Sequence, residues 1–262
     1  MTLKDFWKYA AATAVIAAVA GALFFSGRRL DKSRKETTCG KIEVEFRDGD
    51  GTGLVSADDV KRIVAREYGN CSGRRLEEID LSAIEKVLDN RNGILKSDAY
   101  TTDDGTLHIQ ISQREPVLRM ISGNGVWYVD ETGYIFPGQK SYAKRIPVVD
   151  GAIPLDISID FKGEPKTGRE REWLGRVLKL AGYMNGSRTW SNAISQINVN
   201  SRGQLVLIPS KGRERFNIGS PEEFGKKFAK IEDYYKFIVP DRGEKAYSDV
   251  NVSYDGQIVC RK

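Results

Sequence analysis

The sequence contains little of the chemistry that enzymes use. Its 262 residues include one histidine, His108, and three cysteines, none of which forms a Cys-x-x-Cys pair. No Gly-x-Ser-x-Gly, Gly-x-Gly-x-x-Gly or P-loop spacing occurs. His108 lies between Leu107 and Ile109 in an alternating segment and points away from their face, which is typical of a surface residue. We therefore predict no catalytic residue, no cofactor, no metal and no small-molecule substrate.

Paired carboxylates can perform acid–base chemistry without a motif, and the chain has two adjacent pairs. Asp58-Asp59 stands at an expected helix start and Asp103-Asp104 at an expected turn, where capping accounts for both. Residues 48–51 begin like a calcium loop but lack the later ligands. A carboxylate-based cell-wall hydrolase is therefore an alternative that no motif supports.

The excess of positive charge is confined to the N-terminus. The net charge is +5; the first 35 residues carry seven basic and two acidic residues, and the remainder carries 34 of each. A neutral remainder argues against the basic face that nucleic-acid binding needs. The basic residues instead flank residues 9–25, an uncharged stretch rich in alanine and valine.

We predict a transmembrane helix over residues 9–26, with a cytoplasmic tail of residues 1–8 and a linker of residues 27–38. A cleaved signal peptide is the alternative, because Ala18-Val19-Ala20 has the small-x-small pattern that precedes cleavage. The apolar run continues through Leu23-Phe24-Phe25, which favours an anchor. The basic flanks alone favour an external N-terminus, but long domains translocate with little regard to charge. We therefore expect the N-terminus in the cytoplasm and the large C-terminal part outside it.

The cysteines Cys39, Cys71 and Cys260 neither require nor exclude an oxidising compartment. Cys39 and Cys71 can bridge the start of one element to the end of the next. All three can equally be small buried thiols, and the sequence leaves their disulfide state open.

Residues 39–115 have the pattern of a small α+β module. A strand over residues 41–46, two amphipathic helices and two further strands, over residues 94–101 and from Leu107 onward, follow in the order β-α-α-β-β. Ser56 with Asp59 predicts the first helix start, and Asp80 predicts the second. The side chains expected to face the core are Ile42, Val44, Phe46, Val60, Ile63, Val64, Leu81, Ile84, Val87, Leu88, Leu107, Ile109 and Ile111.

Pro116 marks the end of this module. Proline has no backbone N–H to donate to a neighbouring strand, so Pro116 is expected to end the strand or to stand at a sheet edge. An aromatic hairpin follows, in which the turn 130–133 joins strands at residues 127–129 and 134–136. One sheet is therefore predicted to end here and a second to begin, in a module over residues 116–262.

This second module is predicted to be mostly antiparallel β with two helices. The first helix is expected over residues 170–184, with Trp173, Val177, Leu180 and Met184 on one stripe. The second is expected to start at Ser220-Pro221-Glu222-Glu223, which combines a cap, a proline and a carboxylate, and to stop at Pro240. Its apolar stripe is Phe224, Phe228, Ile231, Tyr235 and Ile238. Extended segments are expected at residues 146–151, 155–161, 194–200, 203–209 and 216–218, with a final strand pair over residues 247–259.

A membrane span, a β-α-α-β-β module and a β module in this order resemble the bacterial cell-division family FtsQ/DivIB over nearly the whole chain. The resemblance rests on several short motifs, each weak alone. They are Ile79-Asp80-Leu81 to Glu85 to Leu88, the strand ending in Arg114-Glu115-Pro116, Tyr128-Val-Asp-x-x-Gly133 to Phe136-Pro137, Ile146-Pro-Val-Val-Asp-Gly151, Phe216-x-Ile-Gly219 and Val250-Asn-Val-Ser-Tyr254-x-x-Gln257-Ile-Val259. Ser253 departs from the pattern, since the family often has arginine before that tyrosine.

The resemblance implies a non-enzymatic divisome scaffold of the cell inner membrane, with one span and its C-terminal domains in the periplasm at the division septum. It implies a POTRA-like module, implicated in recruitment to the site. It also implies a β module that binds a small coiled-coil protein of the FtsB type, together with one of the FtsL type, and so governs septal peptidoglycan synthesis. Scaffolding and active restraint of the septal synthase are both open.

The residues offer a physical route to such binding. A chain that ends in a strand can leave that strand at a sheet edge, where unpaired N–H and C=O groups accept another strand. Alternation places half of a strand's side chains inside, so Val250, Val252 and Tyr254 are equally consistent with a core position. The predicted partner-binding residues are Val252, Ser253, Tyr254, Gly256, Gln257, Ile258 and Val259.

A different function is open to a POTRA-like module. Such modules also serve outer-membrane protein assembly and secretion, where they precede a β-barrel. Here the following region lacks a succession of long alternating strands and contains two amphipathic helices, which argues against this alternative.

Overall fold

The computed structural model describes residues 37–47, 53–123, 125–138, 142 and 145–262, and the chain forms two compact units. The first unit ends at Gln113, and the second comprises Arg114–Lys262 together with the short segment Thr52–Leu54. The expected tail, the expected membrane helix and the loop 48–51 lie outside the described residues. Among the residues that are described, no helix is both long enough and apolar enough to cross a bilayer.

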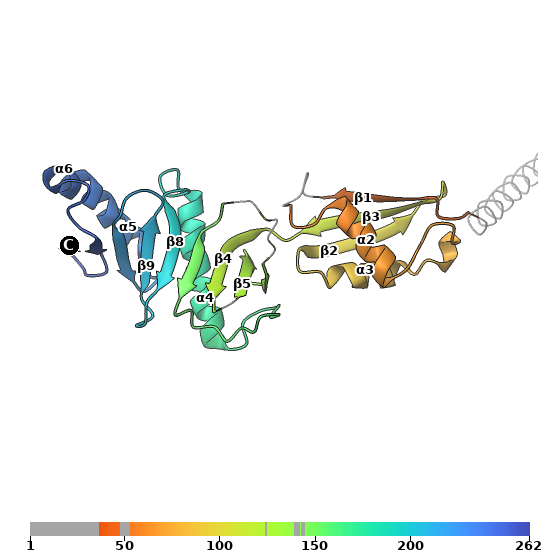
Figure 1. Ribbon diagram of the computed structural model, residues 1–262, viewed down its shortest axis with the longest axis horizontal. Helices are drawn as coiled ribbons and strands as arrows, with labels where there is room; N and C mark the ends of the chain where they lie inside the picture. The colour runs from red at the N-terminus through yellow and green to blue at the C-terminus, as the bar shows by residue number, and fades with distance from the viewer. Residues whose placement is uncertain (1–36, 48–52, 124, 139–141, 143–144) are drawn as a thin grey trace, which may run out of the picture. The chain divides into compact units, whose positions relative to one another are not determined.

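The first unit packs two helices against one face of a three-stranded sheet (Figure 1). β3 is the central strand, parallel to β1 and antiparallel to β2. The predicted β-α-α-β-β order is confirmed. In chain order the elements are β1 (Lys41–Phe46), α2 (Ala57–Glu67), a 3-10 turn η1 (Leu76–Glu78), α3 (Leu81–Asp89), β2 (Ile94–Thr101) and β3 (Thr106–Gln113).

Both helix starts of this unit are made by the predicted caps. Ser56 Oγ accepts from the Asp59 N–H at 3.1 Å, and the Asp59 carboxylate accepts from the Ser56 N–H at 3.0 Å. Asp80 Oδ1 accepts from the Ala83 N–H at 3.0 Å. These bonds satisfy donors that the first helical turn leaves without partners. The fully buried core includes Val60, Val64, Ile84, Leu88, Leu107, Ile109 and Ile111, whereas Ile42, Val44 and Phe46 on the edge strand are half-buried.

The second unit is built on a mixed sheet with the strand order β12-β11-β10-β9-β8-β7-β4-β5-β6. Neighbouring strands are antiparallel except at the pairs β4–β7, β7–β8 and β10–β11. Its elements are β4 (Pro116–Ser122), β5 (Gly125–Asp130), β6 (Ile135–Pro137), β7 (Val148–Gly151), α4 (Gly168–Gly186), β8 (Ile194–Val199), β9 (Leu205–Pro209), β10 (Arg215–Gly219), α5 (Phe224–Asp233), a π-helical turn η2 (Tyr234–Ile238), α6 (Val239–Arg242), β11 (Asp249–Asn251) and β12 (Val259–Arg261).

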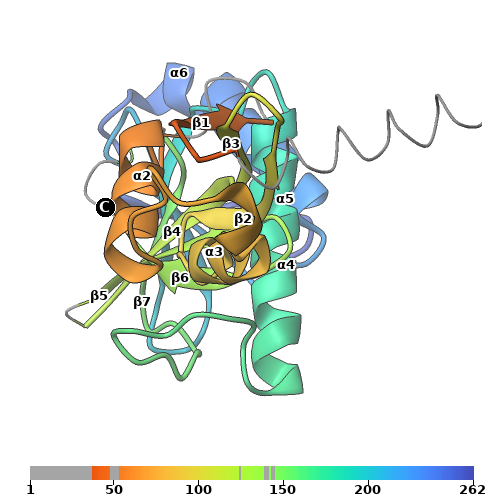
Figure 2. The same ribbon diagram turned by 90° about the vertical axis from the view of Figure 1, so that its right-hand side faces the viewer.

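The helices α4 and α5 lie along the same side of this sheet (Figure 2). The Tyr183 ring on α4 contacts two rings of α5, with centroids 5.0 Å from Phe224 and 5.2 Å from Phe228. Phe228 in turn meets Trp190 edge-on at 4.8 Å. Large apolar side chains of both helices and of the sheet are thus buried in one core cluster. Their burial is a main source of the unit's stability.

Pro116 is placed differently from one of the two expectations. It is the first residue of β4, and β4 lies inside the sheet between β7 and β5. The edge position is therefore wrong, because the first residue of a strand tolerates a missing N–H even in the sheet interior. The preceding strand β3 ends earlier, at Gln113. β4 is a strand that no pattern predicts, whereas residues 155–161, which are expected to be extended, form no strand.

The predicted start of the second helix is also wrong. α5 begins at Phe224 after Glu223, which has a left-handed φ of +45°, and Ser220 does not cap it. Tertiary contacts hold the segment instead: Lys227 Nζ donates to the Ser220 carbonyl oxygen at 2.7 Å, and Glu222 pairs with Arg176 of α4 at 2.6 Å. These contacts outweigh a local capping pattern.

Pro240 does not stop the helical path, which continues through α6 to Arg242. The π-helical turn before α6 is wider than an α-helical turn. The helical path therefore tolerates the hydrogen bond that is lost because Pro240 has no N–H. The wider turn also shifts the buried face by one residue. Tyr234 is fully buried, whereas Tyr235, which the helical stripe predicts to be inside, is 38% exposed.

Candidate functional site

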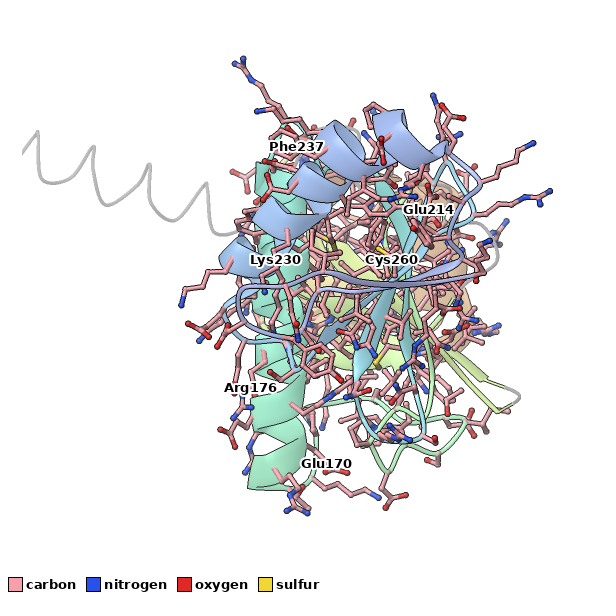
Figure 3. The ribbon with its side chains drawn as sticks, turned by 90° about the vertical axis from the view of Figure 1, so that its left-hand side faces the viewer. Glu170, Arg176, Glu214, Lys230, Phe237 and Cys260 are labelled. Carbon is pink, nitrogen blue, oxygen red and sulfur yellow. The ribbon has the colours of Figure 1, made fainter. Side chains whose placement is uncertain are left out.

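The C-terminal strand β12 is the last strand of the nine-stranded sheet. Its one neighbour in the sheet is β11, with Val250 opposite Cys260. β11 in turn runs parallel to β10. Figure 3 views the molecule from this end, with Cys260 labelled on the terminal strand. Within the described residues β12 therefore presents a free edge, where backbone groups can pair with an added strand.

A groove of about 420 Å³ lies beside this edge. Its described lining includes three basic residues, Arg202, Arg261 and Lys262, and one acidic residue, Asp249. The groove is therefore suited to a ligand that carries negative charge. Its described lining comprises Arg202, Gln204, Asn217, Asp249, Val250, Asn251, Tyr254, Val259, Arg261 and Lys262.

The loop between β11 and β12 is held by hydrogen bonds. The Val252 N–H donates to the Asn217 carbonyl oxygen at 3.0 Å, and the Ser253 N–H and Oγ both donate to Asn251 Oδ1, at 2.9 and 2.7 Å. Lys230 of α5 donates from Nζ to the carbonyl oxygens of Val252, at 3.2 Å, and of Tyr254. The backbone that presents the Tyr254 side chain is therefore anchored at several points.

Gly219 allows this loop to approach β10. Its φ is +67°, a left-handed value that favours glycine. A Cβ atom at this position would lie 3.0 Å from Ser253 Cβ, which is tighter than ordinary packing. A side chain at Gly219 would therefore push the loop away from the sheet.

The structure places the seven predicted residues in different surroundings. Val252 is fully buried in the core, so its side chain does not reach the surface, and its role as a partner contact stays a prediction. Tyr254 is 52% exposed, and both Tyr254 and Val259 line the groove. Ser253 is half-buried and bonded to Asn251, Gly256 and Gln257 are exposed beyond it, and Ile258 is half-buried against the core.

Sequence reasoning missed the groove residues that other segments contribute. Arg202 comes from the turn between β8 and β9, Gln204 from the approach to β9, and Asn217 from β10. No local pattern connects them to the C-terminus, because only the sheet order brings them to β11. Arg261 and Lys262 directly follow Val259, so their charge was a signal that could have been used.

A cavity of about 800 Å³ elsewhere in the second unit bears on the enzyme alternative. Trp190, Phe216 and Tyr235 are among its lining residues. Glu232 is the one carboxylate among the described residues around it. A glycoside hydrolase of the common type needs two carboxyl groups on either side of the bond it cleaves. The described residues around the cavity do not include such a pair.

The cysteines are free thiols in this structure. Cys39 and Cys71 are buried, and burial raises the pKa of both thiols. Burial also raises the pKa of Cys260, which is half-buried on β12. A raised pKa disfavours the thiolate, which is the reactive form.

Two family models match the chain. Residues 37–112 match a POTRA-like domain, and residues 115–261, more than half of the chain, match the family described as FtsQ/DivIB, C-terminal related. The chain belongs to the FtsQ/DivIB family. No match to a curated protein was found. The FtsQ/DivIB match spans the nine-stranded sheet from β4 to β12, including the free edge and the groove.

FtsQ/DivIB proteins form a non-enzymatic family that acts in septal cell division. The family implies protein–protein interactions within the divisome. The free edge at β12 with its basic groove is the candidate site for them among the described residues.

Proposed function

We propose that this protein is a divisome scaffold anchored in the cell inner membrane by a single span over residues 9–26. Its N-terminus is cytoplasmic, and its POTRA-like domain (residues 39–115) and β domain (residues 116–262) are periplasmic at the division septum. The β domain binds a small coiled-coil membrane protein of the FtsB type, which joins one of the FtsL type. The complex links the protein to septal peptidoglycan synthesis.

The observation that carries this proposal is the free edge of β12 inside the FtsQ/DivIB match. An extended partner segment adds to such an edge as a further strand, so that backbone hydrogen bonds provide affinity and flanking side chains provide specificity. Tyr254 supplies an exposed aromatic anchor, of the kind that often dominates interface energetics. The basic residues Arg202, Arg261 and Lys262 favour a partner segment with carboxylates beside that strand.

The test is the affinity of the protein for the extracytoplasmic part of the FtsB-type partner. We expect Tyr254→Glu and Arg202→Glu each to weaken binding at least about tenfold, which corresponds to about 1.4 kcal/mol. Phe237→Glu is the matched control, because Phe237 is a 60% exposed aromatic residue that does not line the groove. Unchanged affinity in both groove variants, with folded protein shown by circular dichroism, would rule out this edge as the binding site.

The POTRA-like domain is proposed to contribute to recruitment, and localisation tests the function as a whole. A fluorescent fusion of the full chain is expected to form bands at midcell. The alternative, a POTRA-containing factor for envelope protein assembly or secretion, predicts a uniform envelope signal instead. A cell-wall hydrolase would degrade purified peptidoglycan, which the proposed scaffold leaves intact.

A further inference from the structure

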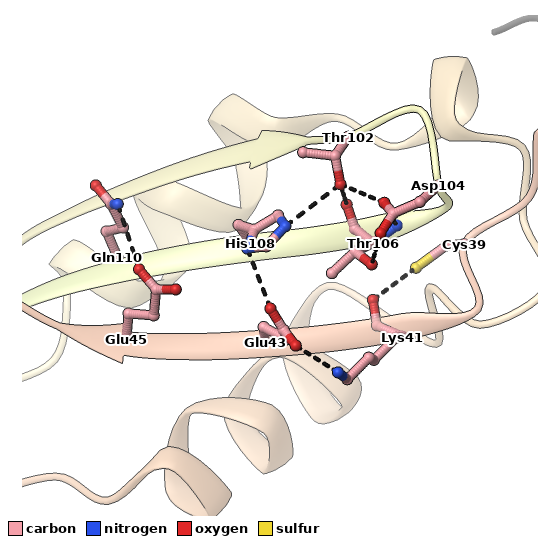
Figure 4. A network of polar contacts seen from close by, with 9 residues as sticks. All are labelled: Cys39, Lys41, Glu43, Glu45, Thr102, Asp104, Thr106, His108 and Gln110. Atoms are coloured by element: carbon pink, nitrogen blue, oxygen red, sulfur yellow. Dashed lines mark hydrogen bonds and ion pairs between the residues drawn. The ribbon is translucent and has the colours of Figure 1, made fainter.

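The solvent-facing side of the three-stranded sheet carries a cluster of three potential metal ligands (Figure 4). Glu43 and Glu45 are two residues apart on β1 and share one face, and His108 on β3 is the cross-strand neighbour of Glu43. One ligand atom from each of the three lies within 4.8 Å of the others. The sheet register, and not a sequence motif, creates this cluster.

Hydrogen bonds around His108 determine which ring nitrogen carries the proton. Thr102 Oγ1 donates its hydrogen to the Asp104 carboxylate, so its oxygen is left to accept. His108 Nε2 lies 3.3 Å from that oxygen and is therefore the nitrogen that donates. The neutral ring then has its free lone pair on Nδ1.

That lone pair points toward negative charge. His108 Nδ1 is 3.5 Å from Glu43 Oε2, is shielded from solvent and has no hydrogen-bond partner among the described residues. Two electron-rich atoms in this position repel each other unless a positive centre lies between them. A proton or a metal ion can supply it.

The surroundings favour a metal ion. Glu43 Oε1 accepts from Lys41 Nζ, which leaves Oε2 directed at His108. Among the described residues, Glu45 Oε2 accepts only a long contact, 3.5 Å from Gln110 Nε2. Tyr100 stacks on the His108 ring at 4.8 Å with an interplanar angle of 9°, which fixes the plane of the imidazole. A histidine whose second nitrogen donates into an oriented polar chain is the usual support of a metal ligand.

We propose that Glu43, Glu45 and His108 bind a divalent transition-metal ion of the zinc class. One oxygen of each carboxylate and His108 Nδ1 are the ligands, and water completes the coordination. In a tetrahedral zinc site the ligand atoms lie roughly 3.3–3.5 Å apart, so the longest separation in the cluster, up to 4.8 Å, has to shorten by up to about 1.4 Å. Rotation of the exposed Glu45 side chain can provide this contraction. The nitrogen ligand makes magnesium and calcium, which prefer oxygen ligands alone, poorer candidates.

The bound ion would join β1 to β3 at the outer face of the POTRA-like sheet. It binds the folded protein and not the unfolded chain, so it stabilises the unit in proportion to the logarithm of the free ion concentration. The inference is independent of the partner-binding edge, because the three ligands lie in the other unit.

Titration of the purified, chelator-treated full chain with Zn²⁺ by calorimetry, and with Co²⁺ by visible absorption, tests the site. We expect one ion per chain, an affinity at least tenfold lower in His108→Gln and Glu45→Gln, and no change in Glu77→Gln, an exposed carboxylate outside the cluster. The Co²⁺ spectrum is expected to show no thiolate-to-metal charge-transfer band. Such a band would place the ion on cysteine and overturn the proposal.

Two further results would overturn it. The first is the absence of saturable binding by the unaltered chain, which would leave a proton as the positive centre. The second is full affinity in Glu45→Gln, a variant whose exposed side chain can be changed without threatening the fold.

Discussion

Arg114 and Asp130 form an ion pair with 2.7 Å between Arg114 Nη1 and Asp130 Oδ2, and their side chains are only 12% and 6% exposed. The guanidinium of Arg114 also lies over the Tyr134 ring, 3.7 Å from its centroid. The other oxygen, Asp130 Oδ1, accepts from the Thr132 N–H at 3.0 Å, from Thr132 Oγ1 at 2.6 Å and from the Tyr134 N–H at 3.1 Å. One carboxylate thus ties Arg114, which directly follows the last residue of the first unit, to the β5–β6 turn.

Replacing Asp130 by alanine is expected to destabilise the second unit by about 3–5 kcal/mol, because it leaves the Arg114 charge buried without its partner. Urea denaturation monitored by tryptophan fluorescence measures the loss, since Trp127 lies in β5. Glu131→Ala changes the exposed neighbouring carboxylate and is expected to cost less than about 0.5 kcal/mol. Equal effects of the two substitutions would contradict this role of the ion pair.

Replacing Tyr234 by phenylalanine is expected to stabilise the protein by about 1 kcal/mol. The Tyr234 side chain is fully buried, and its hydroxyl has no hydrogen-bond partner among the described residues. Burial of this hydroxyl therefore costs desolvation free energy that no hydrogen bond offsets. Tyr142→Phe is the matched control, because the buried Tyr142 hydroxyl donates to the Pro116 carbonyl oxygen at 3.5 Å. We expect the control to be neutral or destabilising in thermal denaturation; a loss of stability in Tyr234→Phe would show that its hydroxyl has a partner after all.

Stability is expected to fall in alkaline solution. Desolvation, with a smaller effect of the Glu214 charge, raises the pKa of Tyr234 to about 12, and desolvation with the Glu115 charge raises the pKa of Tyr142 to about 12. An unfolded tyrosine ionises near pH 10, so the unfolded chain releases these protons first. The folded state is therefore progressively disfavoured as the pH rises from about 10 to about 12. Denaturant midpoints measured across this range test the direction, and Tyr234→Phe is expected to reduce the slope.

The elements that the sequence predicts well are those in which local signals and burial agree. The capping box at Ser56, the N-cap at Asp80 and the alternation of Leu107, Ile109 and Ile111 each describe one element, and the structure reproduces them. Ser220 does not cap a helix, although its sequence pattern predicts a helix start equally well. There, Lys227 and Arg176 draw the segment into tertiary contacts that a local window does not contain.

The candidate site was predictable only where it is continuous in the chain. Tyr254 and Val259 belong to the terminal hairpin and line the groove, as alternation and position suggest. Val252 shows the limit of that reasoning, since alternation states that half of the side chains are inside without stating which half. Arg202 lines the same groove because the strands from β8 to β12 are neighbours in the sheet. This strand order is a property of the whole sheet and is not contained in any local segment.

Replacing Lys230 by methionine is expected to weaken capture of the FtsB-type partner several-fold while the free energy of unfolding changes by less than about 1 kcal/mol. Lys230 Nζ donates to the Val252 and Tyr254 carbonyl oxygens, so its loss frees the loop that presents Tyr254 and adds an ordering cost to binding. The methionine keeps most of the apolar stem, so packing is preserved.

Lys226→Met is the matched control for this substitution, because Lys226 lies on the same helix and pairs only with the exposed Glu223 among the described residues. Binding titrations of both variants against the same partner segment, each compared with its urea midpoint, separate a loosened loop from a destabilised fold. If Lys230→Met and Lys226→Met bind the partner equally well, the loop does not need this anchor, and the edge strand alone would have to account for recognition.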